Sequence, residues 1–213
     1  MSSPPTTRPP QQERSRQSLA RILTAGAELL AERGYDGFAI AELCERAHVS
    51  AGSLYARFPS REAVILAVHE HAVDRMSAEA AALYDGPGWD GLDAAGTIER
   101  AVALLLTHYL EHRRLLKVFI LRSGVDERMQ RIGAIGMARI ADAFTRRLLT
   151  RAAAMPHAEA EVAIQACFAI AFESTSWHVA FGDLFDATLP GVVDIGTRLP
   201  EVCRLYLLTP PTP

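Results

Sequence analysis

The chain has 213 residues, of which 49% are hydrophobic and 22% charged, and its formal net charge is −3. This length and composition, without an opening hydrophobic stretch, predict a soluble cytoplasmic protein with one or two cored domains. The purest apolar run, residues 162–172, is far shorter than the ~20 residues that span a bilayer, which argues against a membrane partner.

Charge is distributed unevenly along the chain. Residues 8–61 hold eight Arg against six Asp and Glu, a net of +2, so the remainder carries −5. A locally basic end on a weakly acidic body is compatible with DNA binding.

The cysteines predict neither a disulfide nor a metal site. Cys44, Cys167 and Cys203 are odd in number, distant in sequence and placed within apolar helical patterns. We interpret them as buried thiols in a reducing compartment, and the sequence indicates no cofactor.

Residues 1–13 are rich in Pro, Ser, Thr and Gln, which predicts a disordered tail. Apolar side chains then recur at helical spacing from Leu19 to Leu30, and Gly34 is placed to end this helix as a C′ glycine. A small N-terminal domain is expected over residues 14–60.

Residues 40–61 predict a helix-turn-helix, two short helices joined by a four-residue turn. The first helix turns its apolar residues inward (Ile40, Leu43, Cys44 and Ala47). Ser50 is a good N-cap for the second helix, and Leu54 and Phe58, four residues apart, point to the core. The outward face of that second helix is small, polar and basic, which suits close approach to phosphates and base edges.

The rest of the chain also predicts helices. A long helix over 60–84 precedes a loop at 85–91, and further helices are expected near 92–112, 113–122, 126–154, 158–181 and 189–208. Pro200 should kink or split the last of these, and residues 209–213 form a second tail. The predicted fold is all-α with about nine helices, residues 61–208 forming a larger effector-binding and dimerisation domain.

The N-terminal third of the chain resembles the DNA-binding domain of the TetR/AcrR family of bacterial transcriptional regulators. The matching runs include Glu32-Arg33-Gly34-Tyr35, Val49-Ser50, Gly52-Ser53-Leu54-Tyr55 and Phe58-Pro59-Ser60-Arg61. The resemblance is specific because the Leu-Tyr-x-x-Phe signature stands in register with a fixed preceding helix. The resemblance implies that the chain is a transcriptional regulator and not an enzyme. Such a regulator binds a double-stranded DNA operator as a homodimer. It acts as a repressor, and a small-molecule effector releases it from the operator.

The candidate DNA contacts lie on the recognition helix and beside it. The resemblance implies that Tyr55, Arg57 and Arg61 touch phosphates, while residues 51–53 face the groove. The full set of candidates is Arg46, Ser50, Ala51, Gly52, Ser53, Tyr55, Arg57 and Arg61.

Three departures from the family pattern affect this surface. His48 stands where the turn usually carries Gly, and His tolerates a left-handed conformation. Ala39 replaces a capping Ser or Thr that usually meets a phosphate. Ala41 and Ala51 replace residues that are often basic, so base readout must depend on Ser53, the Tyr55 ring and apolar contacts with thymine methyl groups.

The resemblance also implies a two-fold dimer built from the last two helices. The apolar run 162–172 has no polar face, so it must be covered by the domain core or by a second subunit. Two recognition helices would then read a palindrome at a separation of roughly 34 Å. A ligand that moves the helix over 60–84 would change this separation.

Candidate effector residues lie in the second domain: His108, Phe119, Arg122, Met137, Phe172, Trp177 and His178. An aromatic stripe at helical spacing is also typical of an ordinary core. Trp177 and His178 are favoured because the polar residues 173–176 interrupt an apolar helix, and buried polar groups need partners or a cavity. The composition favours an apolar, aromatic-tolerant ligand of unknown identity.

Two alternatives remain. His108-x-x-Glu111-His112 matches the H-x-x-E-H pattern of zinc peptidases, with Glu173 as the one tempting third ligand. The other alternative is a helical bundle whose helix-turn-helix no longer functions, which Ala39, Ala41 and Ala51 would suit.

Overall fold

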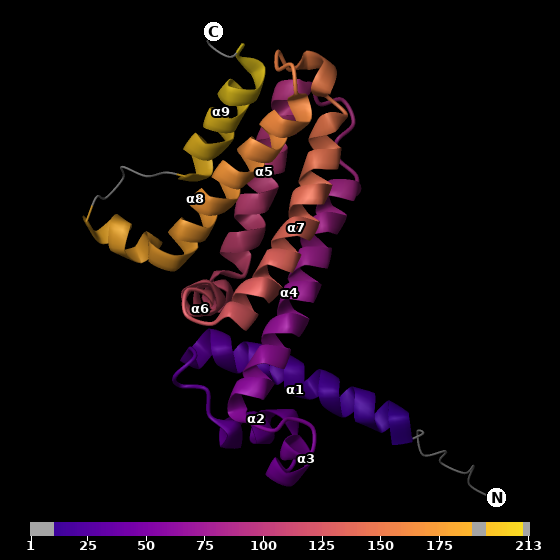
Figure 1. The fold of residues 1–213 in the computed structure, drawn as a ribbon, viewed down its shortest axis with the longest axis vertical. Coiled ribbons are helices and arrows are strands. Elements are labelled where there is room, and N and C mark those ends of the chain that lie inside the picture. The colour runs from indigo at the N-terminus through magenta and orange to yellow at the C-terminus, as the bar shows by residue number, and fades with distance from the viewer. Residues whose placement is uncertain (1–10, 189–194, 211–213) are drawn as a thin grey trace, which may run out of the picture. The chain divides into compact units, whose positions relative to one another are not determined.

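The computed structural model describes residues 11–188 and 195–210, and this part of the chain is helical without a strand. The helices are α1 (Gln11–Arg33), α2 (Ile40–Ala47), α3 (Ala51–Tyr55), α4 (Arg61–Asp85), α5 (Ala94–Glu111), α6 (Arg113–Ser123), α7 (Glu127–Leu149), α8 (Ala160–Thr188) and α9 (Ile195–Leu208), with a 3₁₀ turn at Ala152–Ala154 (Figure 1). The chain divides into two compact units, residues 1–72 and 73–213, and the division falls within α4. The all-α prediction is confirmed.

The first unit packs α1, α2, α3 and the beginning of α4 around one core. Leu29, Leu43 and Leu54, from α1, α2 and α3, are fully buried in it. α1 ends at Gly34, whose φ of +69° and N–H bond to Leu30 O make it the predicted C′ glycine. The three-helix arrangement therefore fixes the orientation of α3 within this unit.

The second unit is a helical bundle in which α5 packs against α7, α8 and α9 (Figure 1). Aromatic side chains fill its centre, and Tyr84 and Phe144 meet edge to face at 5.8 Å. The buried Tyr84 hydroxyl donates a hydrogen bond to Ala101 O, which satisfies it away from water. α7 approaches α4 closely at Gly136, where a Cβ would collide with Val73.

Several predicted boundaries differ from the observed ones. α1 begins at Gln11, so residues 11–13 of the expected tail are helical, while residues 1–10 lie outside the described residues. α7 ends at Leu149 and not at 154, and α8 continues to Thr188. Pro200 neither ends nor splits α9, which is continuous from Ile195, and the predicted start at 189 lies outside the described residues. Thr209 and Pro210 follow α9 without helical structure.

The cysteines are free thiols. Cys167 and Cys203 are buried where α8 meets α9, whereas Cys44 is half-buried. A hydrogen bond with Cys203, together with burial, raises the pKa of the Cys167 thiol. None of the described helices is long and apolar enough to span a membrane.

Candidate nucleic-acid interface and ligand site

The turn between α2 and α3 has the geometry of a helix-turn-helix. His48 ends α2 in the left-handed conformation (φ 52°, ψ 51°), and Val49 N–H donates to Cys44 O at 3.0 Å. The Ser50 hydroxyl accepts a hydrogen bond from Ser53 N at 3.1 Å, which confirms it as the N-cap of α3. Ala39 provides no side-chain cap for α2.

α3 is anchored by one side chain and exposes the others. Leu54 is fully buried, while residues 51–53 are exposed and Tyr55 has 49% of its surface accessible. A Cβ built at Gly52 meets nothing within 4 Å, so this surface is open. The helix is shorter than predicted, because it ends at Tyr55 and Arg57 follows in a turn. The small, polar face predicted for α3 does lie outward; its contact with DNA stays a prediction.

Arg57 is exposed and held from one side. Its Nη2 donates to the carbonyl oxygen of Ser15 at 3.1 Å and to the Ser15 hydroxyl at 2.8 Å. A guanidinium has five N–H donors, so this contact orients the group while leaving others for a phosphate. The sequence did not reveal Ser15 as a partner, because it lies 42 residues away on α1.

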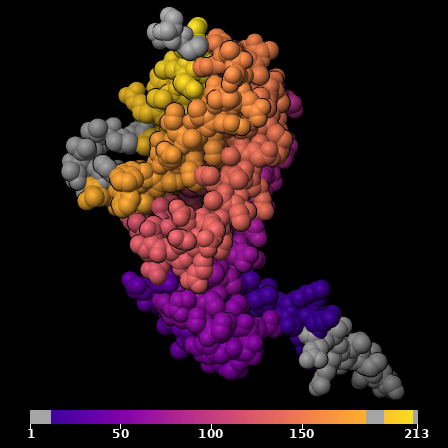
Figure 2. Space-filling view, viewed as in Figure 1, coloured from indigo at the N-terminus to yellow at the C-terminus, as the bar shows by residue number. Residues whose placement is uncertain are grey.

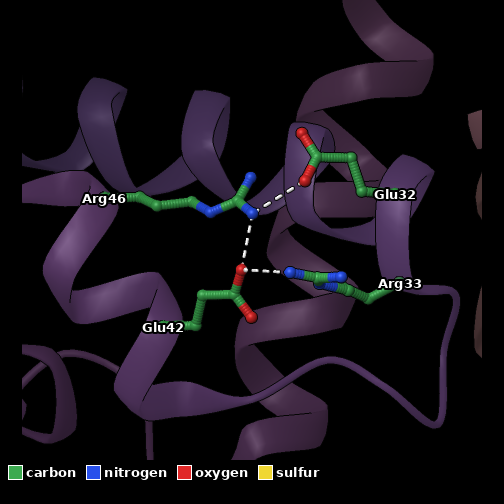
Figure 3. A network of polar contacts seen from close by, with 4 residues as sticks. All are labelled: Glu32, Arg33, Glu42 and Arg46. Carbon is green, nitrogen blue, oxygen red and sulfur yellow. Dashed lines mark hydrogen bonds and ion pairs between the residues drawn. The ribbon is translucent and has the colours of Figure 1, made fainter.

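Arg46 lies in an ion-pair network (Figure 3). Its Nη2 is 2.7 Å from Glu32 Oε2 and 2.5 Å from Glu42 Oε1, and Arg33 approaches the same Glu42 oxygen at 3.4 Å. The hydrogen bond from Arg46 lowers the pKa of Glu42, and the bond to Glu32 raises that of Arg46. Two carboxylates therefore compete with any phosphate for this guanidinium.

Arg61, the other predicted phosphate contact, is also engaged within the protein. Its Nε donates to Phe38 O at 2.9 Å, and its Nη2 donates to Tyr35 O. The guanidinium carbon lies 5.0 Å from the centre of the Tyr35 ring. Arg61 thus fastens the α1–α2 connection to the start of α4, and a phosphate contact stays a prediction.

The predicted effector residues have different environments. His108 and Phe119 are buried; Arg122, Met137, Phe172 and His178 are half-buried. Trp177 is 56% exposed and lies against Phe181, with ring centres 4.5 Å apart, so its ring covers the surface of α8 and not an interior. The rings of His108 and Phe172 both contact Tyr109, a residue that the sequence did not single out, at 6.4 and 5.6 Å between ring centres.

The polar residues that interrupt the apolar sequence of α8 include two hydroxyl groups without a hydrogen-bond partner in the described structure. Thr175 is fully buried, and neither its hydroxyl nor that of Ser176 has a hydrogen-bond partner among the described residues. Unpaired buried hydroxyls are costly and uncommon. They lie one helical turn from Phe172 along α8.

The residues of the zinc-peptidase pattern do not form a metal centre in the described part of the chain. The rings of His108 and His112 are 4.8 Å apart, and His112 Nε2 lies 3.7 Å from Glu79 Oε2. Burial, followed by the charge of His112, lowers the pKa of His108. No group of three or more His, Cys, Asp or Glu residues there is arranged to hold a metal ion.

Comparisons with known proteins match the N-terminal part of the chain to a family model and most of the chain to solved structures of the same fold. Residues 22–68 match the family model of bacterial regulatory proteins of the tetR family. A TetR-family transcriptional regulator from Mesorhizobium loti has a similar structure, with 15% identity, a TM-score of 0.68 and coverage of 91% of this chain and 95% of its own. Salmonella enterica GusR is 19% identical, with a TM-score of 0.62 and coverage of 95% and 99%. FadR from Bacillus subtilis, solved with stearoyl-CoA, is 12% identical, with a TM-score of 0.60 and coverage of 88% and 97%. No curated protein matches the chain.

Proposed function

We propose that this chain, whose residues 22–68 match the tetR family of bacterial regulatory proteins, represses transcription as a homodimer bound to a palindromic operator. The observation that carries the proposal is the surface of α3, where Leu54 is buried and Ser53 and Tyr55 face outward. A helix so anchored can enter a major groove with its small residues against the base edges. The Tyr55 hydroxyl and Arg57 would contact phosphates on either side.

Exposed apolar side chains support the dimer. On α8, Val162, Ile170 and Trp177 are 45–56% exposed, and on α9, Val202 and Leu205 are 48–51% exposed. The surfaces of α8 and α9 adjoin in the space-filling view (Figure 2). An apolar patch of this kind is typical of a protein–protein interface. A second copy of the chain, packed through the same two helices, would cover it.

Release by an effector is supported by the interior of the second unit. Tyr109 and Phe172 offer an aromatic contact, and the hydroxyls of Thr175 and Ser176 offer hydrogen bonds. The FadR structure with stearoyl-CoA is of a protein with this fold that holds a small molecule. We propose that an apolar or aromatic effector binds here and weakens operator binding.

The proposal is tested by gel-shift titration of DNA flanking the chain's own gene, at several salt concentrations. Tyr55→Ala and Arg57→Ala should weaken binding to all sequences, because phosphate contacts carry no sequence information. Arg57→Ala should also flatten the dependence of log K on log salt by about two, one neutralised phosphate per subunit of the dimer, whereas Tyr55→Ala removes an uncharged hydroxyl and should leave this slope unchanged. The mass of the complex should correspond to two chains per duplex.

Arg131→Ala is the matched control, because Arg131 is an exposed arginine on α7 whose side chain is 68% accessible. It removes the same charge without touching the α3 surface and should leave the salt slope unchanged. A wild-type salt slope in Arg57→Ala would refute the Arg57 contact, and a wild-type affinity in Tyr55→Ala would refute the Tyr55 contact. A wild type that binds no flanking DNA would favour the alternative of a helix-turn-helix without function.

A further inference from the structure

A basic cleft lies between the start of α6 and the C-terminal half of α8, which pack together in the second unit (Figure 1). Its volume is about 240 Å³. Its lining combines charged and polar side chains with apolar residues and one glycine. The lining residues are Leu110, Arg113, Arg114, Lys117, His178, Val179, Gly182 and Asp183.

The charges of this cleft are unbalanced. Three cationic side chains from α6, Arg113, Arg114 and Lys117, face a single carboxylate, that of Asp183. The cleft therefore keeps an excess of two positive charges even when His178 is neutral.

The carboxylate of Asp183 lies among the positive charges of this cleft. Its carboxylate oxygen lies 3.0 Å from Lys117 Nζ, yet the side chain is 91% exposed. The hydrogen bond from Lys117 lowers the pKa of Asp183, and the charges of Lys117, Arg113 and His178 lower it further. Side chains of both helices therefore already stabilise one anionic group at this position.

Gly182 makes room for the imidazole in this arrangement. A Cβ at position 182 would lie 3.0 Å from both Nδ1 and Cε1 of His178, closer than a side chain normally packs. The glycine lets the ring lie close to the helix at the edge of the cleft. His178 can then donate one more hydrogen bond to an anion beside Lys117.

We propose that the cleft between α6 and α8 binds the dianionic phosphate group of a small molecule. A phosphate carries two negative charges near pH 7, which matches the excess of the cleft, and guanidinium groups bind phosphate oxygens in a bidentate manner. The volume exceeds that of the anion, which leaves space for the atoms attached to it. Val179 belongs both to the lining of the cleft and to the core cluster that contains Phe168, so an attached apolar group can extend toward the core.

The binding itself does not depend on the chain's action on DNA. That phosphate binding also weakens operator binding rests on the proposed function. The two statements are therefore tested separately, first without DNA and then with it.

The first experiment is calorimetric titration of the full-length protein with inorganic phosphate and with phenyl phosphate, against sodium chloride at the same ionic strength. Lys117→Gln should weaken phosphate binding about tenfold, because it removes a charge-assisted hydrogen bond. Asp183→Asn should strengthen binding, because it removes the competing carboxylate. Arg131→Gln, which removes an exposed charge that does not line the cleft, should leave the affinity unchanged.

Opposite effects of Lys117→Gln and Asp183→Asn would support the site. Tighter binding of phenyl phosphate than of inorganic phosphate would show that the group belongs to a larger ligand, whereas equal binding would point to free phosphate. No binding of either probe, or affinities that neither variant changes, would overturn the proposal. Gel shifts with the same probes then test the phosphate site and the regulator separately. If the protein binds phosphate but not DNA, the phosphate site is supported and the proposed regulator is refuted. If it binds DNA but not phosphate, the regulator is supported and the phosphate site is refuted.

Discussion

Replacing Arg61 with alanine should destabilise the N-terminal unit more than it affects contact with phosphates. The guanidinium donates to the carbonyl oxygens of Tyr35 and Phe38 and lies over the Tyr35 ring. Truncation leaves two backbone acceptors without their donor at the connection between α1 and α2. The family resemblance would instead predict a variant that folds normally and binds DNA less tightly.

The magnitude follows from these contacts. Hydrogen bonds from a charged donor contribute about 1.5–3 kcal/mol each, and a cation–π contact at a partly exposed site adds about 0.5–1 kcal/mol. The side chain is 27% exposed, so water replaces part of what is lost. We expect Arg61→Ala to lower the free energy of unfolding by about 2–4 kcal/mol, within the range for loss of a partly buried polar network.

Urea denaturation followed by far-UV circular dichroism measures this change. Arg61→Lys is the informative second variant, because lysine keeps the positive charge but cannot reach both carbonyl oxygens with one rigid group. Arg61→Lys should lose much of the stability that the Arg61 hydrogen bonds contribute, and it should keep any DNA affinity that depends on the positive charge. If both variants unfold at the wild-type urea concentration while DNA binding falls, the structural role assigned to Arg61 is wrong.

Two further predictions concern the turn of the helix-turn-helix and the start of α7. His48→Gly should raise the free energy of unfolding by about 0.5–1 kcal/mol, because it removes a left-handed backbone strain of about 1–2 kcal/mol at some cost in chain entropy. His48→Val should lower the free energy of unfolding. A lower urea midpoint for the glycine variant would contradict this prediction. The Asp126 side chain caps α7, and its hydrogen bond with Arg128 lowers the pKa of Asp126 from 3.8 to about 2. The ionised carboxylate therefore contributes to stability in full above pH 3.8, and this contribution disappears as the pH falls toward 2. Acid titration of the unfolding free energy should therefore show a smaller loss over this interval in Asp126→Asn than in the wild type, and parallel curves would refute the assignment.

Local features of the fold were predictable because they depend on neighbours in sequence. The Ser50 cap, the Gly34 helix end and the left-handed His48 follow from residue type and position within a few residues. The burial of Leu54 followed from helical spacing.

The partners of the arginines were not predictable in this way. Arg46 meets Glu32 from another helix, and Arg61 meets carbonyl oxygens more than 20 residues away. Sequence spacing placed both on the surface, and only the packing of α1 against α2 shows that they are engaged. Trp177 was favoured because polar residues interrupt its helix, and the sequence did not show that its ring is 56% exposed.

The open space around Gly52 has an evolutionary consequence. Residues 51–53 do not pack against the core, because Leu54 is the residue of α3 that is buried there and nothing lies within 4 Å of a Cβ added at Gly52. Under the proposed function, mutations there would alter which base pairs are preferred without endangering the folded state, so the target sequence of such a protein would be free to drift between lineages. Divergence in operators can thus outpace divergence in architecture.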